Sequence, residues 1–304
     1  MVECKKFISL VSRNTKCYFK DKFTFFMSLL TPLILLVLFA TFLRNVYVDS
    51  FRAALTSNNF QFENQNRLIE GMAGAWLLSS IVGVSSVTVA FMSNLIMIED
   101  KINSTLNDYL VSPVKPTTLS IAYFVSNFFV TFAVIMCVML IGHIYLAAVG
   151  WYISVGDAFM IIVDCICCIL FGTLFAGVVE SFVSTQGGLS AVVSLVSSMY
   201  GFLCGAFMPI STFSAGLRNV LGLLPGTYSI GILRNHYLGG YVSALADEGV
   251  SVEVLEGIND SFDANLYLFG HQIPLGAMYG ILLGACGVLL IAYITIVILK
   301  TKKK

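Results

Sequence analysis

Long apolar stretches alternate with short polar connections along this 304-residue chain. A helix needs about 20 apolar residues to cross the hydrocarbon core of a bilayer, so long stretches with few charged side chains mark candidate spans. None of them alternates apolar and polar residues at every second position, as the strands of a membrane barrel do. The pattern predicts six membrane-spanning helices, at about residues 23–43, 72–98, 119–149, 155–183, 188–208 and 275–299.

The segments outside the spans add two smaller features. In residues 1–22, apolar residues such as Phe7, Leu10 and Val11 lie opposite a face of Lys and Arg when the segment is drawn as a helix. That arrangement is typical of a helix lying at the surface of an anionic membrane. The connection at 209–274 contains apolar residues between two prolines, which favours a helix that dips into the outer leaflet.

These features predict an all-α integral membrane protein with one domain over residues 1–304. It consists of a six-transmembrane-helix bundle, an N-terminal amphipathic interfacial helix and a re-entrant outer segment between spans five and six. Between spans two and three, residues 99–116 form a short helix that ends before Pro113, because the residue before a proline disfavours helical geometry. No small-residue cleavage site follows the first apolar stretch, so we expect no signal peptide.

Composition and charge support a membrane location. Hydrophobic residues make up 58% of the chain and charged residues only 11%, whereas soluble domains carry about 25% charged residues. Lys and Arg concentrate in residues 1–22, in the connection at 99–116 and at the C-terminal end, and these residues favour the cytoplasmic side of a membrane. We therefore expect a multi-pass protein of the plasma membrane with both termini in the cytoplasm.

The chain carries no recognisable catalytic or nucleotide-binding motif. It has no G-x-x-x-x-G-K-[ST] phosphate loop, no H-E-x-x-H and no nucleophile elbow. Its cysteines lie mostly in apolar stretches and lack metal-ligand spacing, and no basic patch interleaved with aromatic residues points to nucleic acid. We expect no enzyme activity, no metal site, no cofactor and no nucleic-acid partner in this chain.

The connection at 99–116 carries the most specific motif. It starts with Glu99, continues with Thr105-Leu106 and ends with Ser112-Pro113. A short helix across the end of a bundle can dock into a groove on a soluble partner. The motif resembles the coupling helix of type-two ATP-binding-cassette (ABC) exporter permeases, although it departs from the family pattern at residues 102–104. By this resemblance, the ATPase-coupling residues are Glu99, Asp100, Thr105, Leu106, Tyr109, Leu110 and Pro113.

A second match follows the fifth span. There the family has a glycine, a proline where the chain leaves the membrane, a Leu-Pro pair, a tyrosine and an arginine, which together form an outer re-entrant motif. The corresponding residues of this chain are Gly205, Pro209, Leu224, Pro225, Tyr228 and Arg234. Because both motifs fall where the family has them, the resemblance covers nearly the whole chain.

The resemblance implies the permease subunit of an ATP-driven ABC exporter that moves a drug, an antimicrobial peptide or a lipid-like amphiphile out of the cell. Two copies of an ABC ATP-binding subunit would bind ATP and Mg²⁺ and hydrolyse the ATP. A second copy of the permease, or a homologous permease, would complete the transporter among membrane lipids. A polysaccharide or glycolipid exporter is the nearest alternative within the family.

Two other classes of protein stay open. One is an ion-coupled secondary transporter or channel with Asp164, in the fourth span, as its titratable group; the other is a membrane anchor that transports nothing. A carboxylate near the centre of a membrane helix costs about 2.5–3.5 kcal/mol on insertion scales, so Asp164 should face the bundle or be protonated. In the family, the second and fifth spans line the substrate path. With Asp164 added, the candidates for that path are Phe91, Met92, Asn94, Asp164, Tyr200, Phe202 and Met208.

Overall fold

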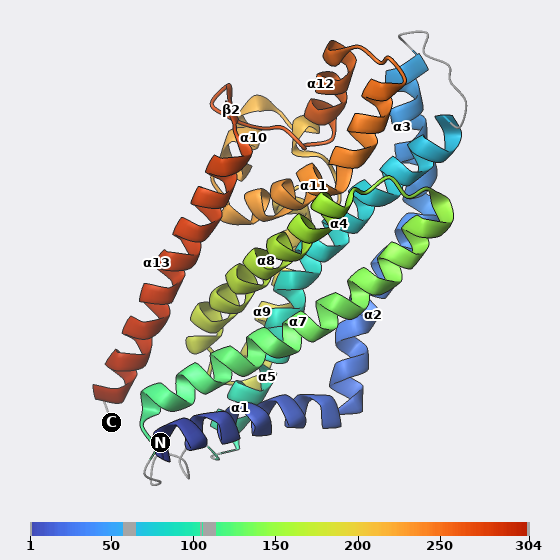
Figure 1. The fold of residues 1–304 in the computed structure, drawn as a ribbon. Coiled ribbons are helices and arrows are strands. Elements are labelled where there is room, and N and C mark those ends of the chain that lie inside the picture. The colour runs from blue at the N-terminus through green and yellow to red at the C-terminus, as the bar shows by residue number, and fades with distance from the viewer. Residues whose placement is uncertain (1, 57–64, 104, 106–113, 303–304) are drawn as a thin grey trace.

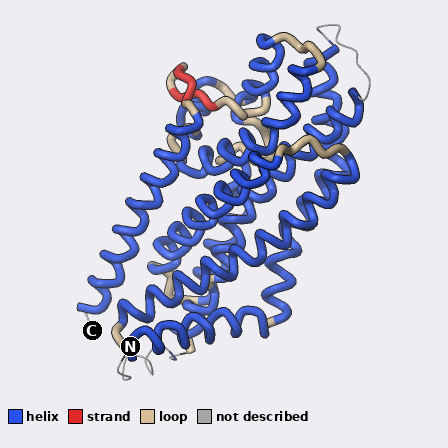
Figure 2. Tube along the Cα trace, in the orientation of Figure 1, coloured by secondary structure: helices blue, strands red, loops and turns tan. Residues whose placement is uncertain are grey.

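The computed structural model describes residues 2–56, 65–103, 105 and 114–302, and most of them are helical (Figure 1). A two-stranded antiparallel hairpin is the only sheet in this part of the chain (Figure 2). The elements are α1 (Val2–Lys20), α2 (Lys22–Leu38), the π-helical turn η1 (Phe39–Leu43), α3 (Arg44–Thr56), α4 (Gln65–Ser93), α5 (Leu95–Ile102), α7 (Pro116–Val149), α8 (Val155–Ser181), α9 (Gln186–Leu203), the 3₁₀ turn η2 (Ile210–Thr212), α10 (Ala215–Leu221), α11 (Pro225–Asp247), α12 (Val252–Ser261), β1 (Leu266–Leu268), β2 (His271–Ile273) and α13 (Leu275–Lys302).

In the described ranges, four helical segments are long and apolar enough to cross a membrane: α4 with α5, α7, α8 and α13. A fifth is counted if α1 and α2, which meet at a bend of 74°, form one broken span. The stretch predicted as the fifth span forms α9, in which Gln186 and several serines and glycines lower the hydropathy. The structure confirms an all-α protein of the membrane type, and the count of six spans stays a prediction.

Helix α4 lies at the centre of the bundle. It contacts α2, α3, α7, α8, α9 and α11, and every residue from Gly71 to Phe91 is buried. Small residues allow this close packing: a Cβ added at Gly172 of α8 would clash with the carbonyl oxygen of Ser86 in α4. Lipid tails are as apolar as the helices, so close van der Waals packing is a main force between membrane helices.

Both termini of the described chain lie at the same end of the bundle (Figure 1). We call it the α5 end, because α5 also lies there, and we call the opposite end, which carries α10, α12 and the hairpin, the α12 end. At the α5 end, α1 lies across the bundle and packs against α7. Leu10 of α1 shares a small apolar cluster with Leu119, Ala122 and Tyr123 of α7.

Residues 209–274 contain more regular structure than the sequence pattern predicts. Between Pro209 and Pro225 a helix does form, but α10 has only seven residues and follows the turn η2. The chain then enters α11, a 23-residue helix that packs against α4, α8 and α13. Its glycines look like turn residues in the sequence. In the structure they allow close contacts, since a Cβ at Gly240 would clash with the carbonyl oxygen of Tyr152.

Candidate functional site

Three helices meet at the carboxylate of Asp100 at the α5 end. Arg13 of α1 donates two hydrogen bonds to it, from Nη1 to Oδ2 at 2.5 Å and from Nη2 to Oδ1 at 2.9 Å. Tyr123 of α7 donates its hydroxyl proton to Oδ2 at 2.6 Å. A paired guanidinium–carboxylate contact is strong and directional, so α1, α5 and α7 are held in one arrangement. We call Arg13, Asp100 and Tyr123 the Asp100 clamp.

The junction between α4 and α5 is also tied to α8. Asn94 precedes α5, and its Nδ2 donates to Oε2 of Glu180 at 2.6 Å instead of capping the helix. Glu180 is fully buried, and its Oε1 has no hydrogen-bond partner in the described part of the chain. Lys101 of α5 donates from Nζ to the carbonyl oxygen of Val183, just after α8. A buried carboxylate is costly without partners, so the Asn94 contact fixes the last turn of α8 to the start of α5.

A third set of polar contacts joins the same junction to α7. Ser93 donates to Oδ1 of Asn127, and Thr131 donates to the same oxygen at 3.1 Å. In return, Nδ2 of Asn127 donates to the carbonyl oxygen of Ala90 at 3.1 Å. All three side chains are buried, and a buried polar network whose members are satisfied makes the local structure rigid. The α5 end is therefore joined by side-chain hydrogen bonds that involve α1, α4, α5, α7 and α8.

The predicted coupling segment at 99–116 is described only in part. Glu99 and Asp100 lie in the last turns of α5; the side chain of Glu99 is exposed, whereas that of Asp100 belongs to the clamp. Thr105 is half-buried. The surface proposed to face the ATPase stays a prediction, because four of its residues lie outside the described ranges: Leu106, Tyr109, Leu110 and Pro113.

The α4 residues predicted for the substrate path lie inside the bundle. Phe91 is fully buried and meets Phe175 of α8 edge to face, with ring centroids 5.4 Å apart. Asn94 contacts Glu180, and only Met92 is half-buried. In the single chain, this part of α4 therefore packs against other helices.

The α9 residues of that predicted path differ in exposure. Tyr200 is buried, with its hydroxyl 3.4 Å from that of Ser229 in α11. Phe202 at the end of α9 is 56% exposed and Met208, five residues after α9, is 42% exposed. The structure does not bring the α4 and α9 candidates together on one surface of the described chain. Their role in transport stays a prediction.

Two residues of the predicted outer motif, Gly205 and Arg234, are in contact. Nη2 of Arg234 donates to the carbonyl oxygen of Gly205 at 2.5 Å and to Oγ of Ser80 at 3.1 Å, and its Nη1 donates to Oδ2 of Asp263 at 3.2 Å. The guanidinium also lies 4.5 Å from the ring centre of Trp76. Gly205 has a φ of +74°, a backbone conformation that residues other than glycine rarely adopt. This buried charge cluster links α4, α11 and the loop before β1.

The other residues of the motif shape the backbone around α10 and α11. Pro209 precedes η2, while Leu224 and Pro225 begin α11, where the missing N–H of a proline costs no helical hydrogen bond. Tyr228 donates its hydroxyl proton to the carbonyl oxygen of Gly222 at 2.6 Å. In the described chain, these four residues therefore fix the backbone at η2 and at the start of α11.

Asp164 occupies a separate buried cluster. Its Oδ2 lies 2.7 Å from Nδ1 of His236 in α11, and its Oδ1 accepts the hydroxyl proton of Tyr279 in α13. Asp164 is fully buried, as the sequence predicts for a carboxylate in the fourth span. Its hydrogen bond raises the pKa of His236, which lies on α11, outside the candidate spans. Both carboxylate oxygens are thus occupied by side chains of neighbouring helices.

The sequence motifs predict Asp100, Asn94 and Arg234 as site residues, but they do not reveal Arg13 and Asp263, the charged partners of Asp100 and Arg234. Arg13 belongs to the basic face of residues 1–22 and lies 87 residues before Asp100. Asp263 lies 29 residues after Arg234. A pairing between distant segments leaves no periodic signal in one sequence, so only the fold reveals it.

The geometry defines an α-helical integral membrane protein with polar contacts at both ends of the bundle and a further buried cluster at Asp164. Residues 5–238 match the family model of the ABC-2 type transporter. The chain therefore belongs to the ABC-2 type transporter family, as the motifs at 99–116 and after span five predicted. No curated protein sequence matches the chain. Members of this family are transport permeases that work with an ABC ATP-binding subunit.

Proposed function

We propose that this chain is the membrane subunit of an ATP-driven exporter and that a separate ATP-binding subunit moves it through residues 99–116. Family membership supports a permease with such a partner. The observation that carries the coupling route is the Asp100 clamp, because it joins the start of this segment to α1 and α7 through side chains. ATP and Mg²⁺ act in the partner subunit.

The three polar contact sets at the α5 end give the proposed motion a physical route. A push on residues 99–116 reaches α5 directly, α1 and α7 through the clamp, and α8 through Asn94 and Glu180. Such coupling requires two states that differ in packing. With helices fixed to one another at the α5 end, a displacement there is passed along the bundle instead of being absorbed locally.

The proposed assembly has two permeases, identical or homologous, and two ATP-binding subunits in the plasma membrane. Each permease is a single domain over residues 1–304 with six spans, in which α2 with η1 and α9 add two to the four long helices. Both termini are cytoplasmic, and their position at one end of the bundle supports an even number of crossings. In this arrangement α1 lies at the inner surface, and residues 209–274 form the re-entrant outer segment.

We propose an amphiphilic cargo, such as a drug, an antimicrobial peptide or a lipid-like molecule, which is moved out of the cell. Support comes from α9, which exposes Leu195, Met199 and Phe202 on its surface. Methionine and aromatic side chains adapt to apolar ligands of varied shape. The same surface can face lipid or a second permease before cargo arrives.

The test is copurification of the chain with its ATP-binding subunit, followed by reconstitution of both in vesicles. Mass spectrometry identifies the partner, and uptake of a fluorescent amphiphile into inside-out vesicles measures transport. We expect transport that requires ATP and stops when the partner is left out. Transport by the chain alone that follows the proton gradient would instead make it a secondary transporter.

A further inference from the structure

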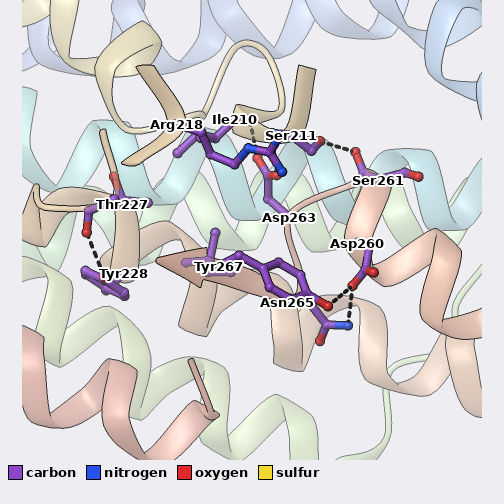
Figure 3. Close-up of a pocket in the computed structure, with 12 residues that line it drawn as sticks. Ile210, Ser211, Arg218, Thr227, Tyr228, Asp260, Ser261, Asp263, Asn265 and Tyr267 are labelled. Carbon is purple, nitrogen blue, oxygen red and sulfur yellow. Dashed lines mark hydrogen bonds between the residues drawn. The ribbon is translucent and has the colours of Figure 1, made fainter. Parts of the chain in front are cut away.

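A second polar site lies at the α12 end, where α10, α12, the start of α11 and the hairpin enclose a cavity (Figure 3). Its volume is about 420 Å³, which is within the range of small-molecule sites. Its lining combines hydroxyl, amide and tyrosine side chains with the charged groups of Arg218, Asp260 and Asp263. Asp263 is already paired with Arg234, so Arg218 and Asp260 decide what the cavity can bind.

Arg218 and Asp260 enter the cavity from different elements, α10 and α12 (Figure 3). Within the described part of the chain, the Arg218 guanidinium makes no hydrogen bond or ion pair, and its Nε is buried. Asp260 accepts from Asn265 at 2.7 Å and from Tyr267 at 3.0 Å but has no cationic partner among the described residues. A buried donor without a partner, such as the Arg218 Nε, is costly. The cavity therefore offers one open cation and one open anion.

The elements beside the cavity expose apolar side chains. Leu217, Val220 and Leu223, on α10 and the turn after it, are 44%, 59% and 61% exposed. Phe269 at the hairpin tip is 65% exposed, and its backbone N–H donates to Oδ1 of Asn219 at 3.0 Å, which fixes the tip to α10. The candidate span α13 begins directly after the hairpin. Exposed apolar side chains beside the end of a span belong at the membrane surface.

We propose that this cavity binds the headgroup of a phospholipid that carries a primary ammonium group, of which phosphatidylethanolamine is the simplest. Its phosphate pairs with Arg218 and its ammonium group with Asp260, while the acyl chains follow the exposed apolar side chains of α10. A choline headgroup fits less well because its quaternary ammonium has no N–H to donate. The proposal rests on the fold of the α12 end and is independent of the export function.

The test uses the full chain purified in detergent and native mass spectrometry of lipid binding. Phosphatidylethanolamine and phosphatidylcholine with the same acyl chains are compared at equal concentrations. We expect the ethanolamine lipid to bind about tenfold more tightly, as charge-assisted hydrogen bonds would provide. Arg218→Gln should weaken the binding of both lipids. Asp260→Asn should lower the affinity for the ethanolamine lipid to that for the choline lipid.

Asp260→Asn keeps an acceptor for Asn265 and Tyr267, so it tests the proposal even if Arg218→Gln does not fold. Arg52→Gln, which changes an exposed ion pair on α3, serves as the control and should leave both affinities unchanged. Equal binding of the two lipids by the unaltered chain would overturn the proposal. The proposal would also be overturned if the Asp260→Asn variant still preferred the ethanolamine lipid to the choline lipid. Displacement of the lipid by soluble phosphoethanolamine at equal concentration would overturn it as well.

Discussion

Two buried carboxylates illustrate how the partner decides the behaviour of a charge. Asp100 pairs with Arg13, whose guanidinium stays protonated at any physiological pH. Asp164 pairs with His236, and this hydrogen bond raises the pKa of the imidazole above its ordinary value. The Asp100 clamp therefore keeps a charged donor at every physiological pH, whereas the charge of the histidine in the Asp164 cluster depends on pH.

Removing the charge of Asp100 should uncouple ATP hydrolysis from transport. In the assembled transporter, we expect Asp100→Asn or Arg13→Gln to lower transport per ATP about tenfold, since a hydrogen bond to a charged group contributes about 1.5–3 kcal/mol. The double variant should be no worse than the more severe single variant, because both remove one interaction. Arg52→Gln is the matched control. Full coupling in both single variants would show that the clamp transmits no motion.

The Asp164 cluster should make stability depend on pH. The folded-state pKa of His236 is raised above 6.5, chiefly by its hydrogen bond with Asp164. Its stabilisation is therefore complete below that value and is lost as pH rises through the folded-state pKa. Asp157 and Tyr279 also face this cluster. We expect the midpoint of thermal unfolding of the purified protein to fall as the pH rises from 6.5 through the folded-state pKa of His236.

The control for this pH dependence is a substitution of the same residue type elsewhere. His271→Gln, at an exposed site in β2, should leave the slope of the midpoint against pH unchanged. Asp164→Asn should flatten the slope. An equal slope in Asp164→Asn and the unaltered protein would place the titrating group elsewhere.

At the scale of elements, the apolar stretches predict the long helices well. The expected spans at 119–149, 155–183 and 275–299 correspond to α7, α8 and α13 with ends that shift by at most three residues. Helix α11 was missed because its buried polar residues and its glycines break the apolar pattern. Those residues are explained by contacts with α4, α8 and the hairpin, and such contacts cannot be inferred from local periodicity.

The contact between α4 and α8 should depend on Gly172. Gly172→Ala places a methyl group against the backbone of Ser86, and overpacking of this kind costs about 1–3 kcal/mol. Gly284→Ala in α13 is the control, because a Cβ there has no atom of the described chain within 4 Å. Thermal unfolding in detergent should show a lower midpoint for the first variant only. A similar midpoint for both would mean that the two helices can move apart at little cost.

At the scale of the whole molecule, the positions of the two ends allow a simple test of topology. Cys4 and Cys17 are exposed at the α5 end, where α13 also ends at Lys302, whereas Glu253 is exposed on α12. With a membrane-impermeant thiol reagent on intact cells, Glu253→Cys should react at once. Cys4, Cys17 and Lys302→Cys should react only after permeabilisation. Reaction of all four from one side would refute the proposed orientation.

The burial of α4 from Gly71 to Phe91 has a consequence for the alternating states of the transporter. A helix surrounded on all sides, with glycines and serines fitted against its neighbours, cannot rotate or slide without breaking many contacts at once. We infer that α4 acts as a fixed pivot. The structural difference between the two states should then lie in the peripheral helices α2 and α9, and distances from α4 to α8, measured by paired spin labels, should be the same in both.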